Sequence, residues 1–158
     1  MSSLKESEQH NLEKAIRVSA DSRCIDEVFS FVEDELLQIP GCSRSEILKF
    51  HMIVDEIFTN IANYAYGEES GDVIVLFSCD DGKTVTLVFK DEGIPYDPSS
   101  ERTPDLNLPV KDRAAGGLGI FMVKSTVDDF LYERCDGWNV LKLVKSIGEK
   151  ISFGERVE

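Results

Sequence analysis

The stretch FHMIVDEIFTNIANYAY, residues 50–66, decides the fold because it joins an apolar helical face to a row of polar side chains. At about 100° per residue, Glu56, Asn60 and Asn63 fall within a narrow arc of the predicted helix. The positions expected to face the core lie well around the helix from that arc: Ile47, Phe50, Val54, Ile57, Ile61 and Ala65. A carboxylate and two carboxamides therefore line one edge of a buried helix, where a ligand can reach them.

A solvated helix edge is the plain alternative to such a site. The pattern gains meaning from two glycine-bearing segments farther along the chain, DEG at 91–93 and GGLG at 116–119. Three segments that each carry weak information become informative when they occur together and in this order.

The composition bounds the class of protein. The chain has 158 residues, 42% of them hydrophobic and 30% charged, which is typical of one globular domain. Its net charge is −13, from 30 acidic and 17 basic residues. A surface with this much negative charge repels phosphate backbones and anionic lipids. We therefore expect neither a nucleic acid nor a membrane as partner.

The cysteines and the N-terminus favour a cytoplasmic protein. Four cysteines are widely spaced and form no C-x-x-C pair, so neither a zinc site nor a disulfide framework is expected. The first residues are polar, without an apolar segment of signal-peptide type, and no run has membrane-spanning length.

The first half of the domain is predicted to begin with a strand and two helices. Residues 1–10 are expected to form a disordered tail, and residues 12–18 alternate as a strand does. Asp21 or Ser22 can cap a first helix, which Pro40-Gly41 ends. The capping-box pattern of Ser43 and Glu46 opens the second helix, which closes near Tyr66-Gly67.

The second half is predicted to contain four strands, a lid and a helix. Residues 72–80 and 83–91 form a hairpin around Asp81-Gly82. A loop rich in proline spans 94–116 and is either a lid or a surface insertion. A helix follows the glycines, and strands at 130–135 and 138–144 complete a domain over 11–148, followed by a C-terminal tail at 149–158.

This order, β-α-α-β-β-lid-α-β-β, excludes a doubly wound parallel sheet, because only one pair of elements can form a right-handed parallel crossover. The fold class is therefore predicted to be α+β, with a mixed, mainly antiparallel sheet and helices on one face. Alternation along the second hairpin strand places Asp91 on its core-facing side, where it needs a partner. An Asp in a turn that caps its own backbone is the alternative.

The three segments suggest a site for a phosphate-bearing ligand. Gly116, Gly117 and Gly119, with Leu118 between them, precede a helix whose N–H groups can approach an anion. Neither the P-loop nor the dinucleotide fingerprint is present. Gly93 leaves room for a flat ring against the backbone, and Asp91 can accept a hydrogen bond from an exocyclic amine.

The polar arc of the second helix adds a metal ligand and a base. Asn60 offers a neutral oxygen to Mg²⁺, a hard ion that shares its shell with waters and phosphate oxygens. Glu56 can orient an incoming hydroxyl or water, or accept its proton.

Taken together, Glu56-x-x-x-Asn60, Asp91-Glu92-Gly93 and Gly117-Leu118-Gly119 resemble the N, G1 and G2 boxes of the GHKL ATPase superfamily. The segments VDEIFTNIANYAY, DEGIPYDP and GGLGIFMVKSTVDDFLYER are similar to its anti-sigma-factor serine/threonine kinase branch. The resemblance covers residues 12–145.

The resemblance implies a two-layer α/β sandwich of the Bergerat type with an ATP lid, and ATP with Mg²⁺ as the bound nucleotide. It implies that Asp91 contacts the adenine amine, Asn60 holds Mg²⁺ and Glu56 is the catalytic carboxylate. The remaining ATP-binding positions would be Asn63, Gly93, Gly116, Gly117, Leu118 and Gly119.

The implied function is an anti-sigma regulatory factor with serine/threonine kinase activity. Its substrate would be a Ser or Thr of an anti-sigma-factor antagonist protein, and a sigma factor would compete as partner. Relatives of this branch often dimerise, so the resemblance also allows a homodimer.

Two alternatives remain open. The chain can be an ATP-gated binding module without phosphotransfer, or the ATP-binding domain of a histidine-kinase-type system, although its only histidines are His10 and His51. Departures from the branch bear mainly on the terminal phosphate. They are Tyr64 in place of His, Pro95 in place of a glycine, and Ala115 in place of Arg; in addition, Asn139 stands where other members of the superfamily have Thr on the last strand. The missing positive charge can come from Lys111, Arg113 or Lys124.

Overall fold

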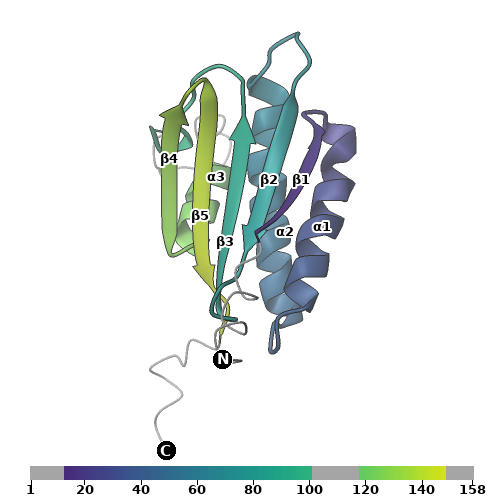
Figure 1. The fold of residues 1–158 in the computed structure, drawn as a ribbon. Coiled ribbons are helices and arrows are strands. Elements are labelled where there is room, and N and C mark those ends of the chain that lie inside the picture. Colours follow the sequence, from purple (N-terminus) through teal and green to yellow (C-terminus); the bar gives the residue numbers. More distant parts are fainter. Residues whose placement is uncertain (1–12, 101–117, 149–158) are drawn as a thin grey trace, which may run out of the picture.

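The computed structural model describes residues 13–100 and 118–148, which form one sheet covered by helices (Figure 1). The predicted tails at 1–10 and 149–158, and most of the predicted lid with Gly116 and Gly117, lie outside the described residues. The strands are β1 (Lys14–Ser19), β2 (Asp72–Ser78), β3 (Thr84–Asp91), β4 (Asp129–Cys135) and β5 (Trp138–Ser146). The helices are α1 (Ile25–Leu37), α2 (Arg44–Tyr64) and α3 (Leu118–Thr126), with single 3-10 turns η1 (Ser22–Cys24) and η2 (Pro98–Ser100).

The predicted element order and the α+β class are confirmed. The strands pair in the order β1-β2-β3-β5-β4, and all four pairings are antiparallel, so the described strands contain no parallel pair of the kind a mixed sheet would have. Figure 1 shows the three helices on one face of this sheet. The β2–β3 hairpin turns at Gly82, which has a φ of +71°, and Asp81 accepts the amide hydrogens of Lys83 and Thr84.

The core forms where the strand period of two meets the helical period of 3.6. Every second residue of β2 and β3 is buried, and these side chains face the buried stripe of α1 and α2. The buried face of α2 is wider than predicted, because Ile53 and Phe58 are fully buried while Ile61 is only half-buried. The reason is that α2 is the central helix, in contact with α1 on one side and α3 on the other.

The two ends of α2 differ slightly from the prediction. Ser43 caps the helix, since its hydroxyl accepts the amide hydrogen of Glu46 at 3.2 Å. The Glu46 side chain does not close the capping box but bonds to Lys145. The helix ends at Tyr64, and the next tyrosine, Tyr66, donates its hydroxyl to the Asp72 carbonyl at 2.6 Å.

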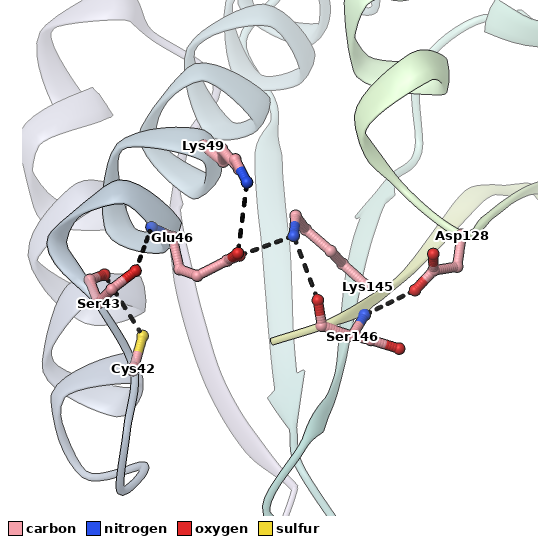
Figure 2. A network of polar contacts seen from close by, with 7 residues as sticks. All are labelled: Cys42, Ser43, Glu46, Lys49, Asp128, Lys145 and Ser146. Atoms are coloured by element: carbon pink, nitrogen blue, oxygen red, sulfur yellow. Dashed lines mark hydrogen bonds and ion pairs between the residues drawn. The ribbon is translucent and has the colours of Figure 1, made fainter. Parts of the chain in front are cut away.

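A buried ion pair ties the start of α2 to the end of β5 (Figure 2). The Lys145 ammonium is 2.7 Å from one carboxylate oxygen of Glu46, whose other oxygen is 3.3 Å from Lys49. Lys145 is 6% exposed and also donates to the Ser146 carbonyl. This pair fixes the helix that carries Glu56 to the strand that carries Asn139.

No helix in residues 13–100 and 118–148 is both long and apolar enough to cross a membrane. Cys24 and Cys79 are partly buried and pack against the core, as small hydrophobic side chains do.

Candidate functional site

A pocket of about 550 Å³, part of it open to solvent, lies between the C-terminal half of α2 and the neighbouring ends of β3 and β5. Its polar lining consists of Asn60, Asp91 and Asn139. Its apolar floor includes Ile57, Phe89 and Leu141, and its rim includes Tyr64, Ile94 and Tyr96. An apolar pocket with a few convergent polar groups is the usual form of a small-molecule site.

Asp91 lies at the end of the core-facing row of β3, as predicted, and is 5% exposed. Its Oδ1 accepts the Gly93 amide hydrogen at 2.9 Å, so it also caps its own backbone. The same oxygen accepts from Asn139 Nδ2 at 2.9 Å. Asp91 is therefore both a core-facing carboxylate with a partner and a cap of its own backbone. Its Oδ2 takes part in neither of these bonds and can accept a hydrogen bond from a ligand.

Asn139 is the partner that the sequence could not supply for Asp91. The two residues are directly opposite each other in the antiparallel pairing of β3 with β5. Their separation in sequence hides this relation, because only the strand register brings the two side chains together. Tyr132 and Arg134, which were not predicted, also hold this region: Tyr132 bonds to Asn139, and Arg134 donates to the Gly93 carbonyl at 2.8 Å.

Gly93 is required by packing against the end of α2. A β-carbon at this position would stand 2.6 Å from the carbonyl carbon and the β-carbon of Ala65. The next residue, Ile94, donates its amide hydrogen to the Ala65 carbonyl at 2.8 Å. This close approach explains the glycine without a ligand, and contact with a flat ring stays a prediction.

Glu56 is half-buried and lies against the first turn of α3. A β-carbon on Gly119 would overlap the Glu56 carboxylate, so a larger residue there would require the Glu56 side chain to move. Burial, and after it the neighbouring charge of Asp55, raises the pKa of Glu56. The structure thus brings together the carboxylate of the first predicted segment and a glycine of the third.

Asn60 lines the pocket one helical turn from Glu56, whereas Asn63 is exposed and is not among the lining residues. No cluster of three or more His, Cys, Asp or Glu side chains suited to a metal ion occurs in the described part of the chain. This does not conflict with Mg²⁺, which commonly takes one or two protein ligands and completes its shell with phosphate oxygens and water. A carboxamide oxygen at Asn60 fits that chemistry.

Of the three candidates for the positive charge near the terminal phosphate, Lys124 lies among the described residues. Lys124 donates to the Ser99 carbonyl at 3.0 Å and lies 5.4 Å from the centre of the Phe130 ring. Lys111 and Arg113 fall outside the described residues, as do Gly116 and Gly117. Leu118 and Gly119 begin α3, so the end of the predicted glycine segment forms a helix N-terminus.

Comparisons with known proteins identify the family and relatives of this chain. The model of a family described as the histidine kinase-like ATPase domain matches residues 18–145. Serine-protein kinase RsbW of Bacillus cereus (strain G9842) is 27% identical over 105 residues, which are 64% of this chain and 65% of that protein. RsbW of Bacillus anthracis (strain A0248) is 26% identical over the same length, so the chain spans 65% of each of these relatives.

A solved structure supports the fold. The crystal structure of the RsbU and RsbW domains of Rv1364c from Mycobacterium tuberculosis superposes with a TM-score of 0.59. The superposition covers 85% of this chain and 32% of that chain, at 16% sequence identity. At this identity the likeness establishes the α+β architecture alone.

Proposed function

The chain belongs to the histidine kinase-like ATPase domain family, and on this premise we propose that it is an ATP-dependent serine/threonine protein kinase acting as an anti-sigma factor. The observation that carries the proposal is the contact of Glu56 with Gly119. It puts a carboxylate at the N-terminus of α3, one helical turn from the pocket residue Asn60. A base, a helix N-terminus and a metal ligand are the parts that phosphoryl transfer requires.

The roles proposed for these residues rest on the family resemblance together with the places of Asn60 and Asp91 in the pocket lining. Asp91 accepts the amine of the adenine ring, with Gly93 beside it. Leu118 and Gly119, at the start of α3, would face the phosphates, and the resemblance implies the same role for Gly116 and Gly117, which lie outside the described residues. Asn60 would hold Mg²⁺ through its carboxamide oxygen, and the bound ion would supply positive charge to offset that of the phosphates.

In the transfer step, a substrate hydroxyl oxygen attacks the γ-phosphorus in line with the bond to ADP. The new P–O bond forms as the bond to ADP breaks, and ADP leaves with that electron pair. Glu56 accepts the proton of the hydroxyl. The raised pKa of Glu56 suits this role, because a base gains strength as its pKa approaches the working pH.

The substrate and partners are proposed from the similarity to proteins named serine-protein kinase RsbW. We propose that the substrate is a Ser or Thr of an anti-sigma-factor antagonist. We also propose that a sigma factor competes with this antagonist for binding to the chain. The acidic charge of −13 agrees with protein partners rather than nucleic acid.

The test incubates the protein with γ-labelled ATP and a candidate anti-sigma-factor antagonist from the same genome. Label is expected on one Ser or Thr of the antagonist, and Glu56→Gln is expected to abolish transfer while ATP still binds. Asp55→Asn is the matched control, since it removes a neighbouring but exposed carboxylate. Transfer that is unchanged in Glu56→Gln would contradict the role of Glu56. ATP binding without any transfer would instead favour the ATP-gated binding module.

A further inference from the structure

The side chain of Asn139 is enclosed by four hydrogen-bonding groups beside Asp91, at the end of the pocket proposed for the adenine ring. It is 6% exposed. Its Nδ2 donates to Asp91 Oδ1 at 2.9 Å and to the Ile94 carbonyl at 2.8 Å. Its Oδ1 accepts from the Tyr132 hydroxyl at 2.5 Å and from the Tyr96 amide at 3.4 Å. A carboxamide has two donor hydrogens and two acceptor sites, so all its capacity is used within the protein.

Two backbone groups fix which way this carboxamide points. The Ile94 carbonyl can only accept a hydrogen bond, so the nitrogen of Asn139 must face it. The Tyr96 amide can only donate, so the oxygen of Asn139 must face Tyr96. The nitrogen is thereby directed at Asp91, and the Tyr132 hydroxyl must donate to Asn139 rather than accept from it.

The consequence falls on Asp91. Its Oδ1 accepts from both Gly93 and Asn139, which leaves Oδ2 as the oxygen available to the pocket. Since the Tyr96 amide bond is long at 3.4 Å, the Tyr132 hydroxyl is the main group that holds the Asn139 oxygen in place. Linked hydrogen bonds of this kind strengthen one another inside a protein.

We propose that Tyr132 and Asn139 are positioning residues that set the base selectivity of the pocket, through their hold on Asp91. An acceptor oxygen at Asp91 favours a purine with an amino group at C6 and disfavours one with a carbonyl there. The inference rests on the proposed function, since it requires that the pocket binds a nucleotide. Both residues line the pocket, but Asn139 has no hydrogen-bonding capacity left for the base, so it acts through Asp91, and Tyr132 acts through Asn139.

The test measures dissociation constants for ATP and for inosine triphosphate, which differ in the amino or carbonyl group at C6 and in the hydrogen that the carbonyl form carries at N1. The full chain is used as wild type, Tyr132→Phe and Asn139→Asp. Tyr66→Phe is the matched control: its hydroxyl also braces this loop, accepting the Glu92 amide hydrogen at 2.8 Å, but it has no bond to Asp91 or Asn139.

The wild type is expected to prefer ATP. Tyr132→Phe is expected to lower that preference by about threefold to tenfold, the effect of one hydrogen bond. Asn139→Asp keeps the shape but replaces the donor facing Asp91 by an acceptor, so it is expected to lower the preference by about tenfold or more. Tyr66→Phe is expected to reduce thermal stability and leave the preference unchanged.

Each other outcome has a distinct meaning. A wild type that binds ATP, with the same preference in all variants, overturns the positioning role and leaves the proposed function standing. If Tyr66→Phe and Tyr132→Phe lower the preference for ATP equally, both hydroxyls merely support the loop in general. That result also overturns the positioning role. A wild type that binds neither nucleotide overturns the proposed function itself. Tyr132→Phe keeps the test decisive if Asn139→Asp does not fold.

Discussion

The carboxylate of Glu56 occupies the space in which a β-carbon on Gly119 would stand. Gly119 is not among the glycines with positive φ, so the need for glycine here comes from close approach and not from backbone conformation. Because Glu56 belongs to α2 and Gly119 to the first turn of α3, the position of α3 directly controls where this carboxylate points.

Gly119→Ala is expected to lower phosphotransfer by about tenfold to a hundredfold, the effect of displacing a reacting group by about an ångström. The added methyl group meets the far end of a flexible side chain, so Glu56 moves aside and the fold is retained. Alanine also has a higher helix propensity than glycine, which favours α3 in this variant. Single-turnover kinetics and thermal unfolding together check this, and a large loss of thermal stability would contradict it.

Gly93→Ala, unlike Gly119→Ala, is expected to destabilise the fold. It should lower the free energy of unfolding by about 1–3 kcal/mol, the usual cost of overpacking. Here the new methyl group meets the backbone of Ala65, which cannot move aside without shifting the end of α2. Urea unfolding measures the change, with Gly119→Ala as the comparison. Equal stability of the two variants would show that the end of α2 adapts to the methyl group.

The pH dependence of transfer should reflect the raised pKa of Glu56. Glu56 must be deprotonated to act as the base. The rate of transfer is therefore expected to rise as the pH passes through the pKa of Glu56 in the folded protein, which lies above its ordinary value of 4.5. Asp55→Asn removes the second cause of the shift and leaves the first, burial. It is expected to move the acidic limb of the rate profile to lower pH without removing it, and a limb that stays in place would contradict the assignment.

The same shift predicts an effect on stability. A carboxyl with a raised folded pKa binds its proton more tightly in the folded state, so stability is lost as pH rises through that pKa. Glu56→Gln is therefore expected to be more stable than the wild type near neutral pH. Thermal unfolding should show the difference fading as the pH falls below 4.5, where Glu56 is protonated in both states. A difference that does not depend on pH would have another origin.

Lys145→Met is expected to lower the free energy of unfolding by about 3 kcal/mol, because it leaves the Glu46 carboxylate in a largely buried place without its closest partner. Replacing both residues, as in Glu46→Leu with Lys145→Met, is expected to restore most of that loss. Chemical denaturation of Lys145→Met and of the double variant checks this. Arg17→Met is the control, since the ion pair of Arg17 with Asp72 is exposed and its loss should matter much less.

Asn60→Ala is expected to reduce the Mg²⁺ dependence of ATP binding by about tenfold, because it removes the proposed protein ligand. Calorimetry with Mg²⁺ and with a chelator measures the ratio of the two dissociation constants. Asn63→Ala is the matched control, since it deletes an exposed carboxamide that does not line the pocket. The ligand assignment fails if both variants keep the wild-type ratio.

The sequence by itself determined the order of strands and helices and the side of each that faces the core. These features follow from local periods, two residues in a strand and 3.6 in a helix, and from turn and cap residues such as Gly82 and Ser43. It also singled out Glu56, Asn60 and Asp91, because polar side chains beside buried rows stand out in such a pattern.

Only the tertiary structure decided which of these side chains meet. Asn139 lies opposite Asp91 because β5 pairs with β3 in one register, and Glu56 meets Gly119 because α3 docks against α2. It also showed that Gly93 is needed for packing on Ala65. Each relation joins segments far apart in the chain, and their meeting depends on register and helix packing, which leave no local period in the sequence.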